Sequence, residues 1–159
     1  MVTFFPVNPD TPRVFFDSSV MIAGSVSRTG ASKALLVLSE IGLIRPVVCP
    51  YIFNETERNL RKKVARALPD YQQLRAKIDW EVVPDPPGDA VSKWLGVIAL
   101  KDVPVLAAAV IAKPDRLVTL DVEDFLKDEK VAQQSGLNIV TPGELLQEIR
   151  QMLAQGFKR

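Results

Sequence analysis

The chain has 159 residues, of which 47% are hydrophobic and 25% charged, and its formal net charge is +1. This composition is typical of a soluble globular protein, and the length is sufficient for a single domain, residues 1–159, with a substantial core. The near-zero net charge does not by itself indicate a charged partner.

Two amino-acid counts exclude whole classes of chemistry. The sequence has no histidine and only one cysteine, which excludes Ser-His-Asp and Cys-His catalysis, histidine-ligated zinc and an intrachain disulfide. Hydrolysis would have to rely on carboxylates, lysine, hydroxyl groups and metal-bound water. No apolar run approaches the roughly 20 residues that span a bilayer. The proline-containing residues 1–12 predict an extended segment without the features of a signal peptide, so we expect a cytoplasmic protein.

Apolar runs and helical periodicity predict alternating strands and helices along the chain. In chain order, we expect a strand at 13–17, a helix at 31–43, a strand at 44–49, helices at 50–64 and 69–78, a strand at 80–83, helices at 89–98 and 103–112, strands at 116–120 and 137–140, and a last helix from 142. Thr141, Pro142 and Glu144 form a capping box at the start of that last helix. Because the strands are continuous apolar runs, the pattern predicts an α/β three-layer sandwich, whose central, mainly parallel sheet of about five strands is flanked by helices.

Four carboxylates lie at strand ends or near helix starts. Asp17 ends the first predicted strand and Asp121 the fourth, and ligands gather at the carboxyl ends of parallel strands. Asp102 introduces the helix at 103–112, where capping that helix is an equally good explanation. Glu55 lies about one turn into its helix and, considered alone, is a typical surface residue. Carboxylates that converge repel one another unless a divalent cation lies among them, and ligation by oxygen alone favours Mg²⁺ or Mn²⁺.

Four segments in this order resemble the PIN domain family, and more narrowly the VapC-like toxin ribonucleases of bacterial toxin–antitoxin systems. They are VFFDSSVMI (14–22), CPYIFNE (49–55), DVPVLAAA (102–109) and LVTLDVEDF (117–125). The resemblance spans roughly residues 13 to 145, and it rests on the ordered set because no single motif is specific. Ser19 stands where the family often has Asn.

The resemblance implies an endoribonuclease that hydrolyses RNA phosphodiester bonds with one or two Mg²⁺ or Mn²⁺ ions. The implied catalytic acids are Asp17, Glu55, Asp102 and Asp121. Three of these, all but Glu55, would hold the metal, and Glu55 would complete its shell or orient the attacking water. The residues that would hold these carboxylates in orientation are Ser18, Ser19, Thr119 and Asp124. For Asp124 we favour a different role, capping the turn at residues 125–126.

Cationic residues crowd the stretch after Glu55 and are candidates for contact with the RNA backbone. These are Arg58, Arg61, Lys62 and Arg66. A solvated helix face explains the same residues. The resemblance also implies a homodimer and a protein antitoxin as a further partner. The competing hypotheses are a non-catalytic module that binds RNA or protein and, with less support, a small-molecule phosphatase.

Overall fold

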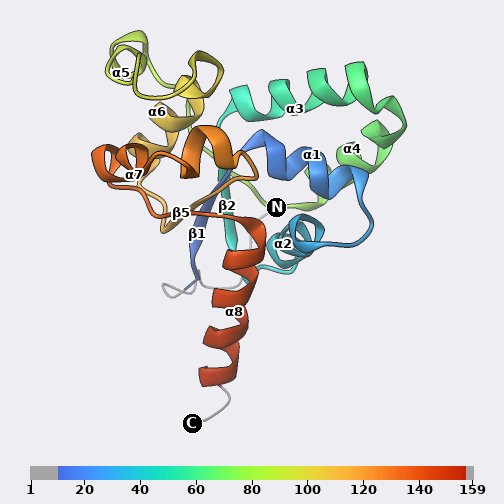
Figure 1. The fold of residues 1–159 in the computed structure, drawn as a ribbon. Coiled ribbons are helices and arrows are strands. Elements are labelled where there is room, and N and C mark those ends of the chain that lie inside the picture. The colour runs from blue at the N-terminus through green and yellow to red at the C-terminus, as the bar shows by residue number, and fades with distance from the viewer. Residues whose placement is uncertain (1–10, 157–159) are drawn as a thin grey trace.

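A computed structural model describes residues 11–156, which fold around one five-stranded sheet (Figure 1). Its strands lie in the order β3-β2-β1-β4-β5, and every neighbouring pair is parallel. The strands are β1 (Arg13–Phe16), β2 (Arg45–Val48), β3 (Glu81–Val82), β4 (Arg116–Val118) and β5 (Ile139–Val140). The predicted central sheet is confirmed, and it is parallel throughout.

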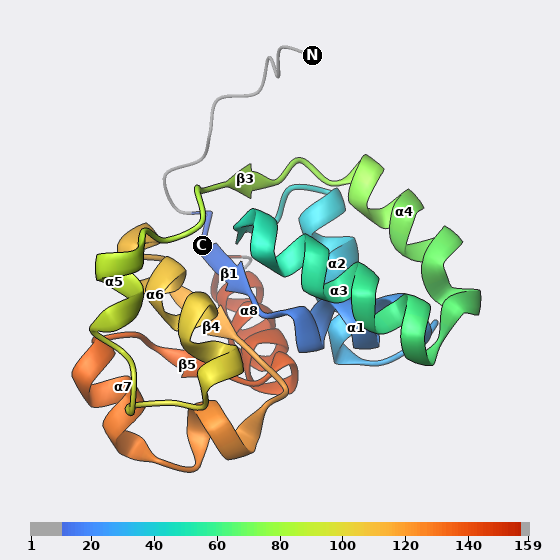
Figure 2. The ribbon, with the colours of Figure 1, turned by 90° about the horizontal axis from the view of Figure 1, so that it is seen from above.

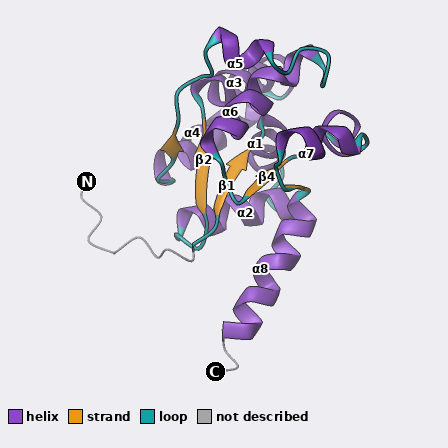
Figure 3. Cartoon of the chain, turned by 90° about the vertical axis from the view of Figure 1, so that its left-hand side faces the viewer, coloured by secondary structure: helices purple, strands orange, loops and turns teal. Residues whose placement is uncertain are grey.

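Helices cover both faces of the sheet. The helices are α1 (Ser18–Val26), α2 (Ala31–Glu40), α3 (Pro50–Lys63), α4 (Leu68–Lys77), α5 (Gly88–Ser92), α6 (Val103–Ala112), α7 (Glu129–Ser135) and α8 (Pro142–Gly156), with short turns η1 (Ala65–Ala67), η2 (Leu100–Asp102) and the π-helical η3 (Val122–Leu126). Figure 2 shows α1 to α4 on one side of the sheet and α5, α6 and α7 on the other. Figure 3 shows α8, which packs on α2, extending beyond the sheet towards the C-terminus. None of the helices within residues 11–156 has the length and apolar character that crossing a membrane requires.

β1, the strand that precedes Asp17, lies in the middle of the sheet, and its apolar residues are buried. Val14, Phe15 and Phe16 have no exposed surface, because helices cover β1 on both faces and neighbouring strands cover both of its edges. This burial explains why β1 is a continuous apolar run rather than an alternating one.

The order of strands reverses between β1 and β4. The chain moves from β1 outwards to β2 and β3, and then crosses back to place β4 on the other side of β1. Such a switch point leaves a crevice at the carboxyl ends of the two strands, where α/β proteins bind ligands. Asp17 and Thr119 directly follow β1 and β4, and the Asp17 N–H donates to the Val118 carbonyl at 3.1 Å.

Three helices differ from the sequence prediction, and the first is α1, which was not among the expected elements. The expected helix at 89–98 ends at Ser92, and the chain then turns through Gly96, whose φ of +83° is a left-handed conformation that a helix does not contain. α7 was not predicted, because Glu129–Ser135 buries only Val131 and has little apolar periodicity. The capping box of α8 is confirmed, since Thr141 and Glu144 exchange hydrogen bonds of 3.0 and 3.2 Å. The predicted extended segment at 1–12 lies mostly outside the described residues.

Candidate metal centre

Three carboxylates gather at the carboxyl edge of the sheet. Asp102 ends η2 and directly precedes α6, Asp121 follows β4, and Asp124 lies in η3. One oxygen from each of the three lies within 4.8 Å of one from each of the others. Asp102 is buried, whereas Asp121 and Asp124 are partly exposed, so the group opens to solvent on one side.

Asp17 lies beside this group and is held by hydroxyl groups. Its Oδ2 accepts hydrogen bonds from Ser19 Oγ at 2.7 Å and from Thr119 Oγ1 at 2.8 Å. Thr119 has no exposed surface, and Ser19 also accepts a bond from the Leu120 N–H at 3.0 Å. The two hydroxyls therefore link the Asp17 carboxylate, just after β1, to Thr119 and Leu120, just after β4.

Glu55 reaches the same region from α3, which contacts α6 (Figure 2). An adjoining face of α3 packs into the core through Ile52, Thr56 and Leu60. Burial raises the pKa of Glu55, the nearby Asp17 carboxylate raises it further, and hydrogen bonding by Ser18 opposes that rise. Glu55 is therefore not the plain surface residue that its position in the helix alone suggests.

The electrostatics of the group are those of crowded, dehydrated acids. Burial, a hydrogen bond to Asp124 and the charge of Asp17 together raise the pKa of Asp102 to about 8. Burial raises the pKa of Asp17, and the charge of Asp121 adds to that rise. Two buried oxygens, Glu55 Oε2 and Asp102 Oδ2, have no hydrogen-bond partner. Carboxylate oxygens without donors in a buried acidic site suit a hard divalent cation.

The capping roles that the sequence suggested are distributed differently in the structure. Asp102 occupies the cap position of α6, but its side chain makes no cap hydrogen bond, so capping does not account for it. The turn at Phe125–Leu126 is capped by Asp121, whose Oδ1 accepts from the Asp124 N–H at 3.1 Å. The favoured capping role of Asp124 is therefore wrong, and its carboxylate belongs to the acidic group instead.

Sequence reasoning missed two residues at this site. The Lys101 Nζ lies 3.5 Å from Asp121 Oδ2 and 3.5 Å from Asp124 Oδ2. The Tyr51 hydroxyl donates to the Lys101 carbonyl at 3.0 Å, and the charges of Glu55 and Asp102 contribute to a raised Tyr51 pKa, which burial raises most. Lys101 adjoins Asp102 in sequence and Tyr51 lies one turn before Glu55, and these spacings were the available signals.

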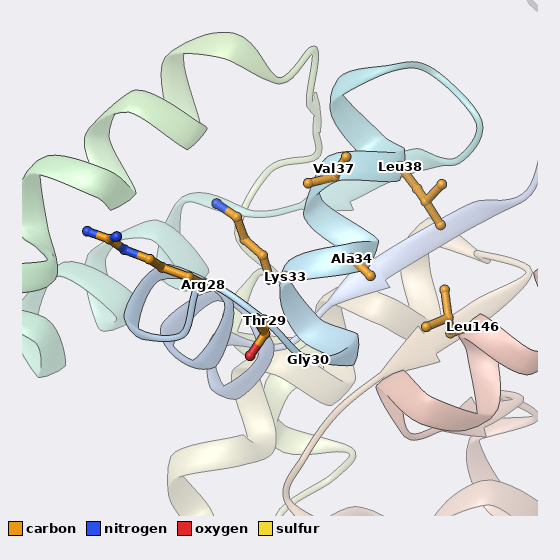
Figure 4. Close-up of a pocket in the computed structure, with 8 residues that line it drawn as sticks. All are labelled: Arg28, Thr29, Gly30, Lys33, Ala34, Val37, Leu38 and Leu146. Carbon is orange, nitrogen blue, oxygen red and sulfur yellow. The ribbon is translucent and has the colours of Figure 1, made fainter.

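Two cavities in the described part of the chain lie elsewhere on the molecule. One of about 400 Å³ lies beside the start of α2, and Figure 4 shows Arg28 and Lys33 at one end of it and Leu38 and Leu146 at the other. Another of about 250 Å³ lies between the start of β4 and α8. Neither is lined by any of the acids at the sheet edge. Because Asp121 and Asp124 are partly exposed, the acidic group can be reached from solvent.

Comparison with known proteins matches residues 13–123 to the PIN domain, a span that includes β1, α3, α6 and β4. The chain belongs to the PIN domain family. PIN domains are generally nucleases that use divalent metals. No curated protein sequence matches the chain significantly.

Solved structures agree with the PIN fold. The chain resembles PAE2754 from Pyrobaculum aerophilum with a TM-score of 0.61 and 15% identity, over 93% of this chain and 95% of that one. It also resembles VapBC2 from Rickettsia felis, a structure solved bound to a DNA fragment from their promoter, with a TM-score of 0.59 and 11% identity over 81% and 98% of the two chains. At these identities the likeness shows the shared fold.

Proposed function

We propose that this PIN protein is a Mg²⁺- or Mn²⁺-dependent endoribonuclease that hydrolyses RNA phosphodiester bonds. The observation that carries the proposal is the group formed by Asp102, Asp121 and Asp124, in which the buried Asp102 Oδ2 lacks any hydrogen-bond donor. Like charges this close are costly without a cation, and the absence of histidine leaves oxygen as the main ligand type.

Each acid would have a separate task. Asp17, Asp102 and Asp121 would hold the metal directly or through water, and the geometry favours Asp124 as an additional ligand. A bound divalent cation lowers the pKa of its water and offsets charge on the phosphate during attack. Ser19 and Thr119 would keep the Asp17 carboxylate oriented.

Glu55 is suited to orient or deprotonate the attacking water. Its Oε2 is buried and unpartnered, and burial raises the pKa of its carboxyl. A carboxylate that is more basic than usual is a better proton acceptor near neutral pH. Ser18, next to Asp17, would supply the hydrogen bond that limits this rise.

The proposed RNA path runs along α3. Tyr51, Glu55, Arg58 and Lys62 recur at intervals of three or four residues, so they share one helical face. Arg58 is exposed and close enough to lower the pKa of both Tyr51 and Glu55. Arg61 and Lys62 are also exposed in the last turn of α3, and Arg66 in η1. An open edge with cations beside it suits single-stranded or looped RNA.

The biological setting that we propose is a cytoplasmic toxin–antitoxin pair. The likeness to VapBC2 supports this setting, and an antitoxin would be a protein partner that inhibits the nuclease. We also propose a homodimer, for which exposed apolar residues are available: Leu95, and Met152 and Leu153 on α8. Light scattering of the purified protein, alone and as Leu153→Asp, tests that interface.

A cleavage assay tests the enzymatic proposal. We expect a labelled single-stranded RNA to be cut with Mn²⁺ or Mg²⁺, and cutting to stop with EDTA and in Asp102→Asn. A generic phosphomonoester should not be hydrolysed, and its turnover would indicate a phosphatase instead. RNA binding without cleavage, at any metal concentration, would identify the chain as a non-catalytic binding module.

A further inference from the structure

A lysine occupies the exposed side of the acidic group. The Lys101 Nζ contacts Asp121 and Asp124, each at 3.5 Å, and these carboxylates belong to the three that lie within 4.8 Å of one another. No other ion pair to these three acids is present within residues 11–156. The ammonium therefore supplies positive charge where the proposed metal would also supply it.

The contact is well placed but weak. The Lys101 side chain is 65% exposed, and 3.5 Å is longer than a strong charge-assisted hydrogen bond. Exposed ion pairs of this kind contribute little to stability. The backbone of the same residue is fixed, because its carbonyl accepts from the Tyr51 hydroxyl at 3.0 Å and the residue lies within η2. Only the flexible side chain is free to move.

We propose that Lys101 is an exchangeable counter-ion of the metal centre, and this inference rests on the proposed nuclease function. In the metal-free protein its ammonium neutralises part of the charge of Asp121 and Asp124. A divalent cation bound by these carboxylates repels the ammonium and displaces it. The side chain, anchored beside the metal, then contacts a phosphate of the bound RNA.

The side chain has the reach and the chemistry for both positions. Lysine presents a compact charge on a flexible four-carbon stem, with three donors that suit carboxylate and phosphate equally. The adjoining Asp102 keeps the stem at the metal centre in either position. Arg58, on α3, acts on Tyr51 and Glu55 instead and makes no ion pair with Asp121 or Asp124 within the described residues.

Metal affinity measured by calorimetry tests the first step. Lys101→Met removes the charge and keeps most of the length, so Mn²⁺ should bind about threefold to tenfold more tightly than in the wild type. A residue with a merely structural role would weaken metal binding when replaced. Lys101→Arg should restore the wild-type affinity, and Lys93→Met, at an exposed lysine just after α5 that has no ion pair to the three acids within the described residues, should leave it unchanged.

RNA affinity tests the second step. With saturating Mn²⁺ and a 2′-O-methyl oligonucleotide that is not cleaved, Lys101→Met should bind more weakly than the wild type. Its slope of log K against log[salt] should be shallower by about 0.7, the value for one phosphate contact on a single strand.

The outcomes separate this inference from the proposed function. Mn²⁺ affinity that is unchanged or weaker in Lys101→Met, in a protein that does bind Mn²⁺, overturns the counter-ion role and leaves the nuclease proposal intact. Tighter metal binding with an unchanged salt slope confirms the exchange and overturns the phosphate contact. A wild-type protein that binds no Mn²⁺ overturns both proposals.

Discussion

The oxygen Oδ2 of Asp102 is buried and accepts no hydrogen bond, although Asp102 stands at the cap position of α6, where an aspartate side chain often accepts one. A buried carboxylate oxygen without a hydrogen bond destabilises the folded state unless another group, such as a ligand, contacts it. The cost appears as the raised pKa of Asp102, whose largest cause is burial. Protonation and metal binding are two ways to remove this cost.

In the metal-free protein, the titration of Asp102 should therefore be visible as a change of stability with pH. Because its folded-state pKa of about 8 exceeds the ordinary 3.8, the folded state binds more protons between these values, and stability falls as pH rises from about 4 to about 8. We expect the melting temperature in EDTA to decline over this range, and to decline less in Asp102→Asn. Equal pH profiles for the two proteins would contradict the assignment. The loss is on the order of a few kcal/mol.

Asp17→Asn tests a second buried acid. The substitution keeps the size of the side chain, and its oxygen can still accept from Ser19 and Thr119. We expect the metal-free protein to melt at the same or a slightly higher temperature, because a like charge is removed. Metal affinity should fall by about tenfold or more. A sharp fall in melting temperature with unchanged metal binding would make Asp17 structural instead.

The site could be predicted from the sequence only where position along an element fixes the direction of a residue. Asp17 and Asp121 follow strands, so their place at the carboxyl edge followed from the parallel sheet. The contacts of Asp124 depend on the π-helical turn η3, which the spacing of apolar residues in the sequence does not predict. Lys101 and Tyr51 meet through one hydrogen bond between residues 50 positions apart, and such a contact leaves no local pattern.

At the scale of elements, α3 joins the core to the proposed RNA path. One face packs through Ile52 and Leu60, and the adjoining face carries Glu55 next to the acids and cations beyond it. Asp85 accepts from the Tyr51 N–H at 2.9 Å, which supplies a partner at the start of this helix. The direction of α3 is thereby fixed at the end where the acids lie.

Replacing Arg61 and Lys62 with Ala tests that path. Both side chains are exposed in the last turn of α3, so folding should be unaffected. Binding of the uncut 2′-O-methyl oligonucleotide should weaken alike for all sequences, and the salt slope should flatten by about 0.7 for each phosphate that the variant no longer neutralises. Metal affinity should barely change, since charges beyond about 10 Å are screened at moderate salt. Lys113→Ala with Lys130→Ala removes the same charge elsewhere, and an equal effect there would refute a specific path.

The helices with a long apolar repeat were predicted correctly. The prediction failed at residues 93–98, where the backbone conformation of one glycine ends the helix. The apolar spacing of Val91, Trp94 and Ile98 resembled a helix, yet Gly96 adopts a positive φ and the residues pack as a turn. Gly42, also at positive φ, lies just beyond the end of α2, within the range 31–43 that the sequence predicted as helix. A glycine within an apolar pattern permits a turn, but tertiary packing decides whether one forms.

At the scale of the whole molecule, the acids come from parts of the chain that pack on different faces of the sheet. Glu55 lies on α3, in the layer of α1 to α4, and Asp102 begins α6 in the opposite layer (Figure 2). A cation held by Asp102, with its water oriented by Glu55, would link the two layers. Stability of the whole fold should therefore increase with metal concentration.

A thermal shift measurement tests this linkage. Metal that binds only the folded protein stabilises it by about 2.7 kcal/mol at a concentration 100 times its Kd, which raises the melting temperature of a chain of this size by about 5–10 °C. We expect Mn²⁺ and Mg²⁺ to give a rise that Asp102→Asn reduces. A rise of the same size in wild type and variant would place the stabilising ion elsewhere.

The position of β1 between β2 and β4 has a consequence for how fast the protein folds. β1 pairs with a strand about 30 residues away and with another about 100 residues away. The second pairing closes a long loop, and the entropy cost of that closure precedes the contacts that offset it. The same pairing brings Asp17 towards Asp121, so a contact with a large cost of loop closure also gathers negative charge. Divalent ions in a refolding mixture should therefore lower the final barrier as well as deepen the native minimum, and chelators should delay the recovery of native structure.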